Sequence, residues 1–236
     1  MVKQHLSRLA APKTWPIKRK GIKFVTRPSP GPHSLETSMP INVILKEVLK
    51  FAKTTSEVKK VLHDKRVLVN KKVVKDYKFP VGLFDVLEIA NSKEAYRMVL
   101  SPTGKFKFIA IDSKESNLKP YKITGKTILK GNKVQLNLDD GTNILVAKDN
   151  FKVNDTLYLS LDKKEIKEHL PFKEGMLIYI LGGNKVSSVG KLSLIKTFKS
   201  LQPDNIIFKT KDGEFETRKN YAMVIGKDKP LIKIEE

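Results

Sequence analysis

The 236-residue sequence contains no cysteine, and it has little acidic charge for its many basic residues. The absence of cysteine excludes disulfides and thiolate zinc sites, and it is typical of proteins in a reducing compartment. No run of about 18 apolar residues occurs, so no membrane-spanning helix is expected. The N-terminus has no apolar segment behind its charges, so the sequence predicts no secretory signal.

Signals for catalysis are also scarce. Histidine occurs four times, without the spacing of a metal site or a catalytic triad, at His5, His33, His63 and His169. Residues 125–127 (Gly-Lys-Thr) match the end of a P-loop, but Pro120 stands at the first-glycine position and no long helix is expected afterwards, which favours a turn between strands. Asp139 and Asp140 precede Gly141 in a hairpin pattern, so we expect them to form a turn rather than a metal site. We therefore predict no catalytic residue, no metal and no cofactor.

Positive charge dominates the composition. Lysine and arginine number 46 against 25 acidic residues, which gives a formal net charge of +21. Such an excess favours association with polyanions, which could be nucleic acid, an anionic membrane or an acidic protein. The sequence has no long amphipathic helix with a basic face, which disfavours a membrane surface. We expect a soluble, cytoplasmic protein that binds nucleic acid.

The excess of positive charge is largest in the first forty residues relative to their acids. They hold eight basic residues against one acid, Glu36, together with the only tryptophan and six of the twelve prolines. Their apolar residues follow neither helical nor strand periodicity, so we predict an extended basic arm that builds no core. Apolar side chains such as Trp15 and Phe24 lie between the cations and could stack on bases. A frayed, solvated terminus is the alternative.

The pattern becomes helical after Pro40. Between residues 41 and 52, apolar residues recur at the spacing of one face of an amphipathic helix. Thr54 and Glu57 form a capping-box pattern, which predicts the start of a short second helix. Lys59 and Lys60 are expected on the solvent face of this second helix.

Strands are predicted for most of the remaining chain. Two β-branched runs around an Asn-Lys turn predict a hairpin at 66–74, and a further strand is expected at 85–89. Beyond residue 95, turn residues separate the strands that we predict at 96–100, 105–111, 133–138, 143–147 and 156–161. A short charged helix is expected at 163–170. A second small β unit is expected after it, and Asp212-Gly213 predicts a hairpin turn there. The predicted fold class is α+β with several domains.

Residues 54–74 resemble the RNA-binding module named after bacterial ribosomal protein S4. The resemblance lies in the segment TSEVKKVL and in the hairpin KRVLVNKKVV. The module pairs a basic second helix with a hairpin, and the cations here are suited to RNA phosphates. Two features depart from the module's pattern. Lys71 stands where the module usually has glycine, which implies strain or another turn type, and Thr54-Thr55 replaces its usual Ser-Arg.

The wider sequence resembles the archaeal and eukaryotic small-subunit ribosomal protein family S4e. The matching residues are His5-Leu-x-Arg8, Ala11-Pro12-x-x-Trp15, Arg27-Pro28-Ser29-x-Gly31-Pro32-His33 and Pro80-Val-Gly82-x-x-Asp85-Val86. This resemblance implies an arm at 1–40, an S4-like module at 41–92, a central β-rich domain at 93–170 and an SH3-like KOW domain at 171–236. The chain has no extra C-terminal sequence of the eukaryotic kind, so an archaeal-like member is expected.

The resemblance and the charge together predict a non-enzymatic component of the small ribosomal subunit. Its expected partners are small-subunit rRNA and neighbouring ribosomal proteins, with no membrane and no small-molecule substrate. The predicted RNA-binding residues are Lys3, His5, Arg8, Lys13, Trp15, Lys18, Arg19, Lys20, Lys23, Arg27, His33, Lys59, Lys60, Lys65, Arg66, Asn70, Lys71 and Lys72. Two alternatives are a transient KOW-bearing translation or transcription factor and an RNA-modifying enzyme that carries an S4-like module.

Overall fold

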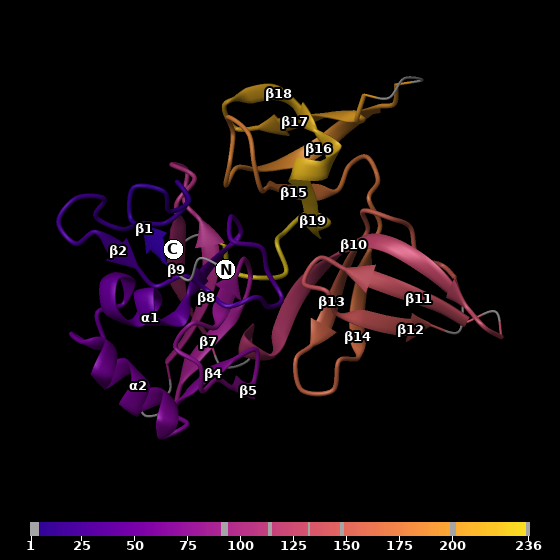
Figure 1. Ribbon diagram of the computed structural model, residues 1–236. Coiled ribbons are helices and arrows are strands. Elements are labelled where there is room, and N and C mark those ends of the chain that lie inside the picture. Colours follow the sequence, from indigo (N-terminus) through magenta and orange to yellow (C-terminus); the bar gives the residue numbers. More distant parts are fainter. Residues whose placement is uncertain are drawn as a thin grey trace. The chain divides into compact units, whose positions relative to one another are not determined.

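The computed structural model describes residues 5–90, 94–112, 115–131, 133–146, 149–198 and 202–234 (Figure 1). The chain divides into two compact units, Met1–Asn117 and Leu118–Glu236. Among the described residues, no helix is both long enough and apolar enough to cross a membrane.

The described residues of the first unit form short helical segments and three antiparallel sheets. The helical segments are α1 (Ile41–Val43), which continues as the π-helix η1 (Ile44–Val48), then α2 (Thr55–His63) and the 3₁₀ helix η2 (Glu115–Asn117). The largest sheet has the strand order β5-β4-β7-β8-β9, with bounds Lys72–Val73, Val67–Val69, Val86–Ile89, Glu94–Leu100 and Phe106–Ile111. The two-stranded sheets pair β1 (Leu6–Ser7) with β2 (Phe24–Val25) and β3 (Ser38–Pro40) with β6 (Pro80–Gly82).

The two helices predicted directly after Pro40 form, but the first is shorter than its apolar pattern. Its buried face includes Ile41, Ile44 and Leu45, as the spacing indicates. The helical segment stops before Lys50, whose φ of 57° lies in the left-handed region. The second helix starts as predicted, because the Thr54 side chain accepts from the Glu57 amide and the Glu57 carboxylate accepts from the Thr54 amide.

The first forty residues differ most from the sequence prediction. Instead of an extended arm without a core, residues 5–40 are folded within the first unit. Trp15 is 1% exposed, and its indole nitrogen donates to the Ser38 carbonyl at 2.8 Å. Ala11 and Val25 are buried as well. The apolar residues have no regular period because they pack from turns and short strands.

The domain boundary predicted after residue 92 does not divide the structure. Strand β7 pairs with β8, for example Leu87 with Tyr96, and β8 pairs with β9. These antiparallel neighbours hold residues 94–111 in the same sheet as the S4-like hairpin. The compact units separate after Asn117.

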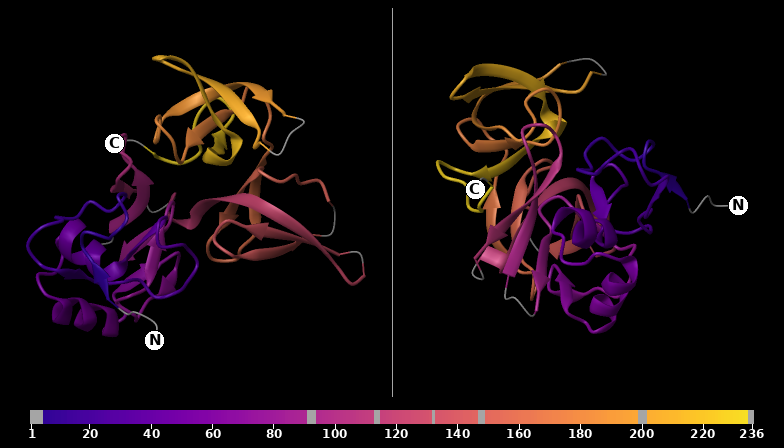
Figure 2. Two further views of the ribbon diagram at one scale, coloured as in Figure 1. Left: turned by 45° about the horizontal axis from the view of Figure 1, so that its top comes forward. Right: turned by 90° about the vertical axis from the view of Figure 1, so that its left-hand side faces the viewer.

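The second unit begins with a five-stranded sheet of order β12-β11-β10-β13-β14. Its strands are Asn143–Val146, Lys133–Leu138, Leu118–Leu129, Thr156–Ser160 and Ile166–Leu170. The long strand β10, a strongly curved ribbon in Figure 2, pairs with β13 through its first half and with β11 through its second. A register shift between Ile123 and Gly125 separates the two halves. Residues 125–127, for which a turn was predicted, lie within β10 and pair with β11.

The helix predicted at 163–170 is wrong. Residues 166–170 form β14, which pairs with β13 through Thr156–Leu170 and Leu157–His169. Lys164 has a φ of 55° and its amide donates to the Ser160 carbonyl, so the charged stretch makes the hairpin turn. Pairing with a buried neighbouring strand therefore overrides the helix propensity of the charged residues.

A second five-stranded sheet, of order β18-β17-β16-β15-β19, completes this unit. Its strands are Gly213–Arg218, Asn205–Thr210, Val189–Lys196, Leu177–Ile180 and Ala222–Gly226. A 3₁₀ turn, η3 (Lys219–Tyr221), joins β18 to β19. Gly190 on β16 lies close to β17, since an added Cβ would lie 2.6 Å from the Lys209 carbonyl oxygen. The predicted Asp212-Gly213 hairpin forms between β17 and β18.

Candidate nucleic-acid interface

The predicted cations of the second helix and its following turn lie on the surface. Lys59 and Lys60 are exposed on α2, and Lys65 and Arg66 are exposed where α2 leads into β4. Arg66 contacts Asp64 at 3.3 Å in a half-exposed pair, which leaves the guanidinium accessible to solvent. The amphipathic helix therefore buries Val58 and Leu62 and presents ammonium groups outward.

The adjoining hairpin has the geometry that its sequence predicts. Both turn residues have positive φ, 50° for Asn70 and 63° for Lys71, as a two-residue hairpin turn of the primed type requires. The Lys71 ammonium contacts Glu88 Oε1 at 2.6 Å and donates to Ser116 Oγ at 3.1 Å. Lys72 is exposed on β5. Of the two lysines, Lys72 is the one available to a partner.

A buried carboxylate holds this hairpin in place. Asp85, which is 0% exposed, accepts from the Asn70 side-chain amide at 2.8 Å and from the Gly82 backbone amide at 2.7 Å. His33 Nε2 lies 3.0 Å from the same carboxylate. Asn70 also accepts from the Val86 amide. Asn70 and His33 therefore hold the backbone, although both were predicted as RNA contacts.

Three predicted contacts in the first forty residues are likewise used internally. Arg8 is 8% exposed and pairs with the Glu47 carboxylate, whose hydrogen bond raises the pKa of the guanidinium against the opposing effect of burial. Arg19 donates to the carbonyls of Arg8, Ala11 and Pro12. Trp15 is buried, so its ring is not offered to a base.

The other described cations of this segment that were predicted as contacts face solvent, and so does part of its apolar surface. His5 is exposed, with its ring 5.2 Å from that of Phe24, and Phe24 is itself 47% exposed. Lys3 lies outside the described residues. The exposed predicted cations of the segment are Lys13, Lys18, Lys20, Lys23 and Arg27.

The sequence prediction missed a cationic pair around Tyr77. The Lys59 ammonium lies 4.7 Å from the centre of the Tyr77 ring, and the Lys78 ammonium lies 5.7 Å from it. Aromatic faces attract cations, so the Tyr77 ring holds one ammonium group from α2 and one from the loop before β6. The adjacent Tyr-Lys pair in the sequence was the available signal, but it does not reveal that Lys59 approaches from α2.

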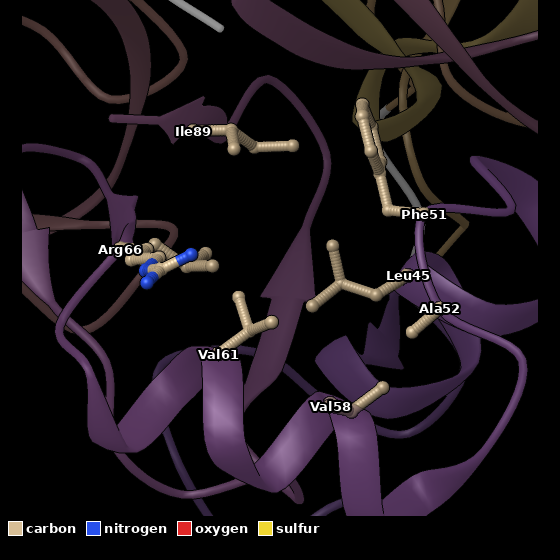
Figure 3. Close-up of a pocket in the computed structure, with 8 residues that line it drawn as sticks. Leu45, Phe51, Ala52, Val58, Val61, Arg66 and Ile89 are labelled. Carbon is tan, nitrogen blue, oxygen red and sulfur yellow. The ribbon is translucent and has the colours of Figure 1, made fainter. Parts of the chain in front are cut away.

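Two of the cavities in the described part of the first unit lie among the elements discussed above. The smaller, about 210 Å³, is lined by aliphatic side chains of η1, α2, β4 and β7 together with Phe51 and Arg66. Figure 3 shows Phe51 and Ile89 on opposite sides of this cavity, with Val58 and Val61 projecting from α2. The larger, about 610 Å³, is lined by residues 27–35 and Lys78. Only the larger has several polar and charged side chains in its wall.

Within the described ranges, no three histidine, aspartate or glutamate side chains gather closely enough to hold a metal ion. The features that remain are exposed ammonium and guanidinium groups fixed on a rigid frame. Such groups bind phosphates.

Three family models match separate parts of the chain. The S4 domain model matches residues 39–87, the RS4NT (NUC023) domain model matches 2–36, and the model of Ribosomal family S4e matches 92–166. The chain is thus a basic protein built around an S4 domain.

Similar proteins and a similar solved structure identify the family of this chain. Small ribosomal subunit protein eS4 from Methanocella arvoryzae is 41% identical over 98% of both chains, and the protein of that name from Archaeoglobus fulgidus is 40% identical over the same shares. The crystal structure of 30S ribosomal protein S4e from Thermoplasma acidophilum matches with a TM-score of 0.70 and 28% identity, covering 81% of this chain and 96% of that one. The chain belongs to the ribosomal protein family S4e, a family of ribosomal proteins rather than of enzymes.

Proposed function

We propose that this protein is a structural component of the small ribosomal subunit and binds rRNA in the cytoplasm. The observation that carries the proposal is the exposed cation cluster on α2 and the hairpin, within a chain of the S4e family. Its proposed members are Lys59, Lys60, Lys65, Arg66 and Lys72. The buried Asp85 network supports this assignment, because it fixes the hairpin that carries Lys72.

Exposed cations of the first forty residues form the second proposed contact region. They lie on folded backbone, since Arg8, Trp15 and Arg19 hold that segment together. Ordering on RNA therefore costs little conformational entropy here compared with a disordered arm. Lysine outnumbers arginine among these residues, which favours phosphate neutralisation over base recognition.

The last β unit supports the finer assignment of a KOW domain with an SH3-like fold. Five strands with one 3₁₀ turn before the last strand, and Gly190 in close contact with β17, are the supporting features. Neighbouring ribosomal proteins and rRNA are both proposed partners of the protein as a whole.

Sedimentation of native lysate at moderate and high salt tests the proposal. Co-migration with small subunits at one copy per particle, surviving the high-salt wash, is the expected result. A transient factor would be lost in high salt, and recovery only at the top of the gradient would contradict a ribosomal role.

Variants connect that role to the cation cluster. We expect Lys59→Gln/Lys60→Gln to weaken rRNA binding and to reduce the slope of log affinity against log salt by about 0.7–0.9 per lost contact. The matched control is Lys227→Gln/Lys229→Gln, which removes equal charge from exposed positions after β19. Equal losses in both variants would show that net charge, rather than the cluster, determines binding.

A further inference from the structure

The cavity lined by residues 27–35 has walls that are fixed at both ends. Ser29 donates from its amide to the Lys78 carbonyl at 2.9 Å and from its hydroxyl to Asp76 at 3.1 Å. At the other end, His33 contacts the buried Asp85 carboxylate at 3.0 Å. The loop is therefore anchored to the frame of the S4 module rather than free in solution.

Close packing makes the loop stiffer still. An added Cβ at Gly31 would lie 2.7 Å from Pro80 Cγ, and one at Gly82 would lie 2.3 Å from the His33 ring. Prolines at 28, 30 and 32 fix φ along the loop. The cavity, of about 610 Å³, is thus preformed, and its volume lies in the range of small-ligand sites.

Cations flank this cavity. Lys78 is part of its wall, and Arg27 lines it from an exposed position. Lys59 reaches the same Tyr77 ring as Lys78, so two ammonium groups share one aromatic neighbour. Neither ammonium makes an ion pair with another residue in the described ranges. Asp76 is the acid nearby, and it accepts from Ser29 Oγ and from the Lys78 backbone amide.

Lys78 and Arg27 place positive charge in the cavity wall, which attracts an anion. The proline rings provide apolar surface, while Ser29 and Ser34 provide hydroxyls. A phosphate on the cations with a ribose and base against the prolines satisfies both parts of the wall. That combination is the chemistry of a nucleotide.

We propose that this cavity binds one unstacked nucleotide of a single-stranded RNA segment, with Lys78 on its backbone phosphate and Arg27 at the edge. The site rests on the proposed rRNA-binding function and adds a contact that the S4 hairpin does not make. A free nucleotide is the alternative source of the same chemistry. The chain-linked form is favoured because the cations extend beyond the cavity along α2, where a neighbouring phosphate would lie.

The test uses the full-length protein and its small-subunit rRNA. Photo-crosslinking with 4-thiouridine-substituted rRNA, followed by mass spectrometry, is expected to place a nucleotide on the peptides that contain His33 and Tyr77. Lys78→Gln is expected to weaken rRNA binding about fourfold at about 0.15 M salt and to lower the salt slope by about 0.7, the value for one single-strand phosphate contact. Arg27→Gln gives an independent second variant. Lys105→Gln, at an exposed position on the loop before β9, is the charge-matched control.

The outcomes separate this site from the wider function. If wild-type protein binds rRNA but Lys78→Gln and Arg27→Gln match Lys105→Gln in affinity and slope, the cavity is not a nucleotide site and the proposed function stands. If wild-type protein does not bind rRNA, the proposed function itself fails. Saturable binding of uridine monophosphate at micromolar concentration, with no gain for an oligouridylate, would overturn the chain-linked form. Unchanged Trp15 fluorescence and melting temperature in each variant show that the first unit remains folded.

Discussion

Lys71 occupies a backbone conformation that ordinarily favours glycine, and this gives a sharp prediction. Its φ is 63°, in the left-handed region, where an L-residue with a side chain costs roughly 1–2 kcal/mol. Its ammonium offsets part of that cost through Glu88 and Ser116. Replacing Lys71 by alanine removes the polar contacts and keeps the strain. Replacing it by glycine removes both.

We therefore expect Lys71→Gly to be more stable than Lys71→Ala by about 1 kcal/mol. This order is the reverse of that at ordinary helix or strand positions, where glycine is the less stable by about 0.5–1 kcal/mol. With a urea m-value of about 2 kcal/mol/M, the difference is a midpoint shift of about 0.5 M.

The assay is urea unfolding followed by tryptophan fluorescence. Trp15 is the only tryptophan and is 1% exposed in the first unit, so its emission reports the unit that contains the hairpin. The neighbouring Lys72, an exposed residue in β5, provides the control. There we expect Lys72→Gly to be less stable than Lys72→Ala. A Lys71→Gly variant no more stable than Lys71→Ala would refute the strain argument.

Two further predictions concern buried polar groups. Asp85→Asn should lower the free energy of unfolding of the first unit by about 1–3 kcal/mol. Asn70 donates to one carboxylate oxygen and the Gly82 amide donates to the other, and the NH2 group that replaces one oxygen cannot accept a hydrogen bond. Urea unfolding followed by Trp15 fluorescence measures this loss. Burial lowers the pKa of Lys122 to about 8, against the attraction of Asp139. The unfolded chain, with an ordinary lysine pKa, then binds more protons above about pH 8, so unfolding free energy should rise with pH up to about 10.5, by about 3 kcal/mol in total. Urea unfolding by circular dichroism should show a flatter pH dependence for Lys122→Met, and equal slopes would contradict the assignment.

Local signals in the sequence predicted local structure well. The Thr54–Glu57 capping box, the Asn70-Lys71 hairpin and the Asp212-Gly213 hairpin are confirmed. In each case the residues that stabilise the structure lie within a few positions of one another, so the motif alone is enough to predict it. The helix predicted at 163–170 failed for the opposite reason, since its strand conformation depends on pairing with β13.

The interface was predicted only in outline. Composition located the basic segments, but it could not distinguish exposed cations from those that support the fold. Arg8 and Arg19 bind a distant carboxylate and nearby carbonyls, and Asn70 binds the buried Asp85. Glu47 lies 39 positions from Arg8, and no sequence spacing indicates that contact. Which of the exposed cations contact RNA stays a prediction.

The divided pairing of β10 has a consequence for how the second unit folds. Its second half pairs with β11, which follows after a short turn, whereas Leu118 in its first half pairs with Ser160. Closing the longer loop costs more chain entropy, so that half should form later. On a ribosome that is still synthesising the chain, β10 would be paired only through its second half until β13 has been made. Its first half would present unpaired amides and carbonyls until β13 emerges, and that interval is when a chaperone would find a strand edge to protect.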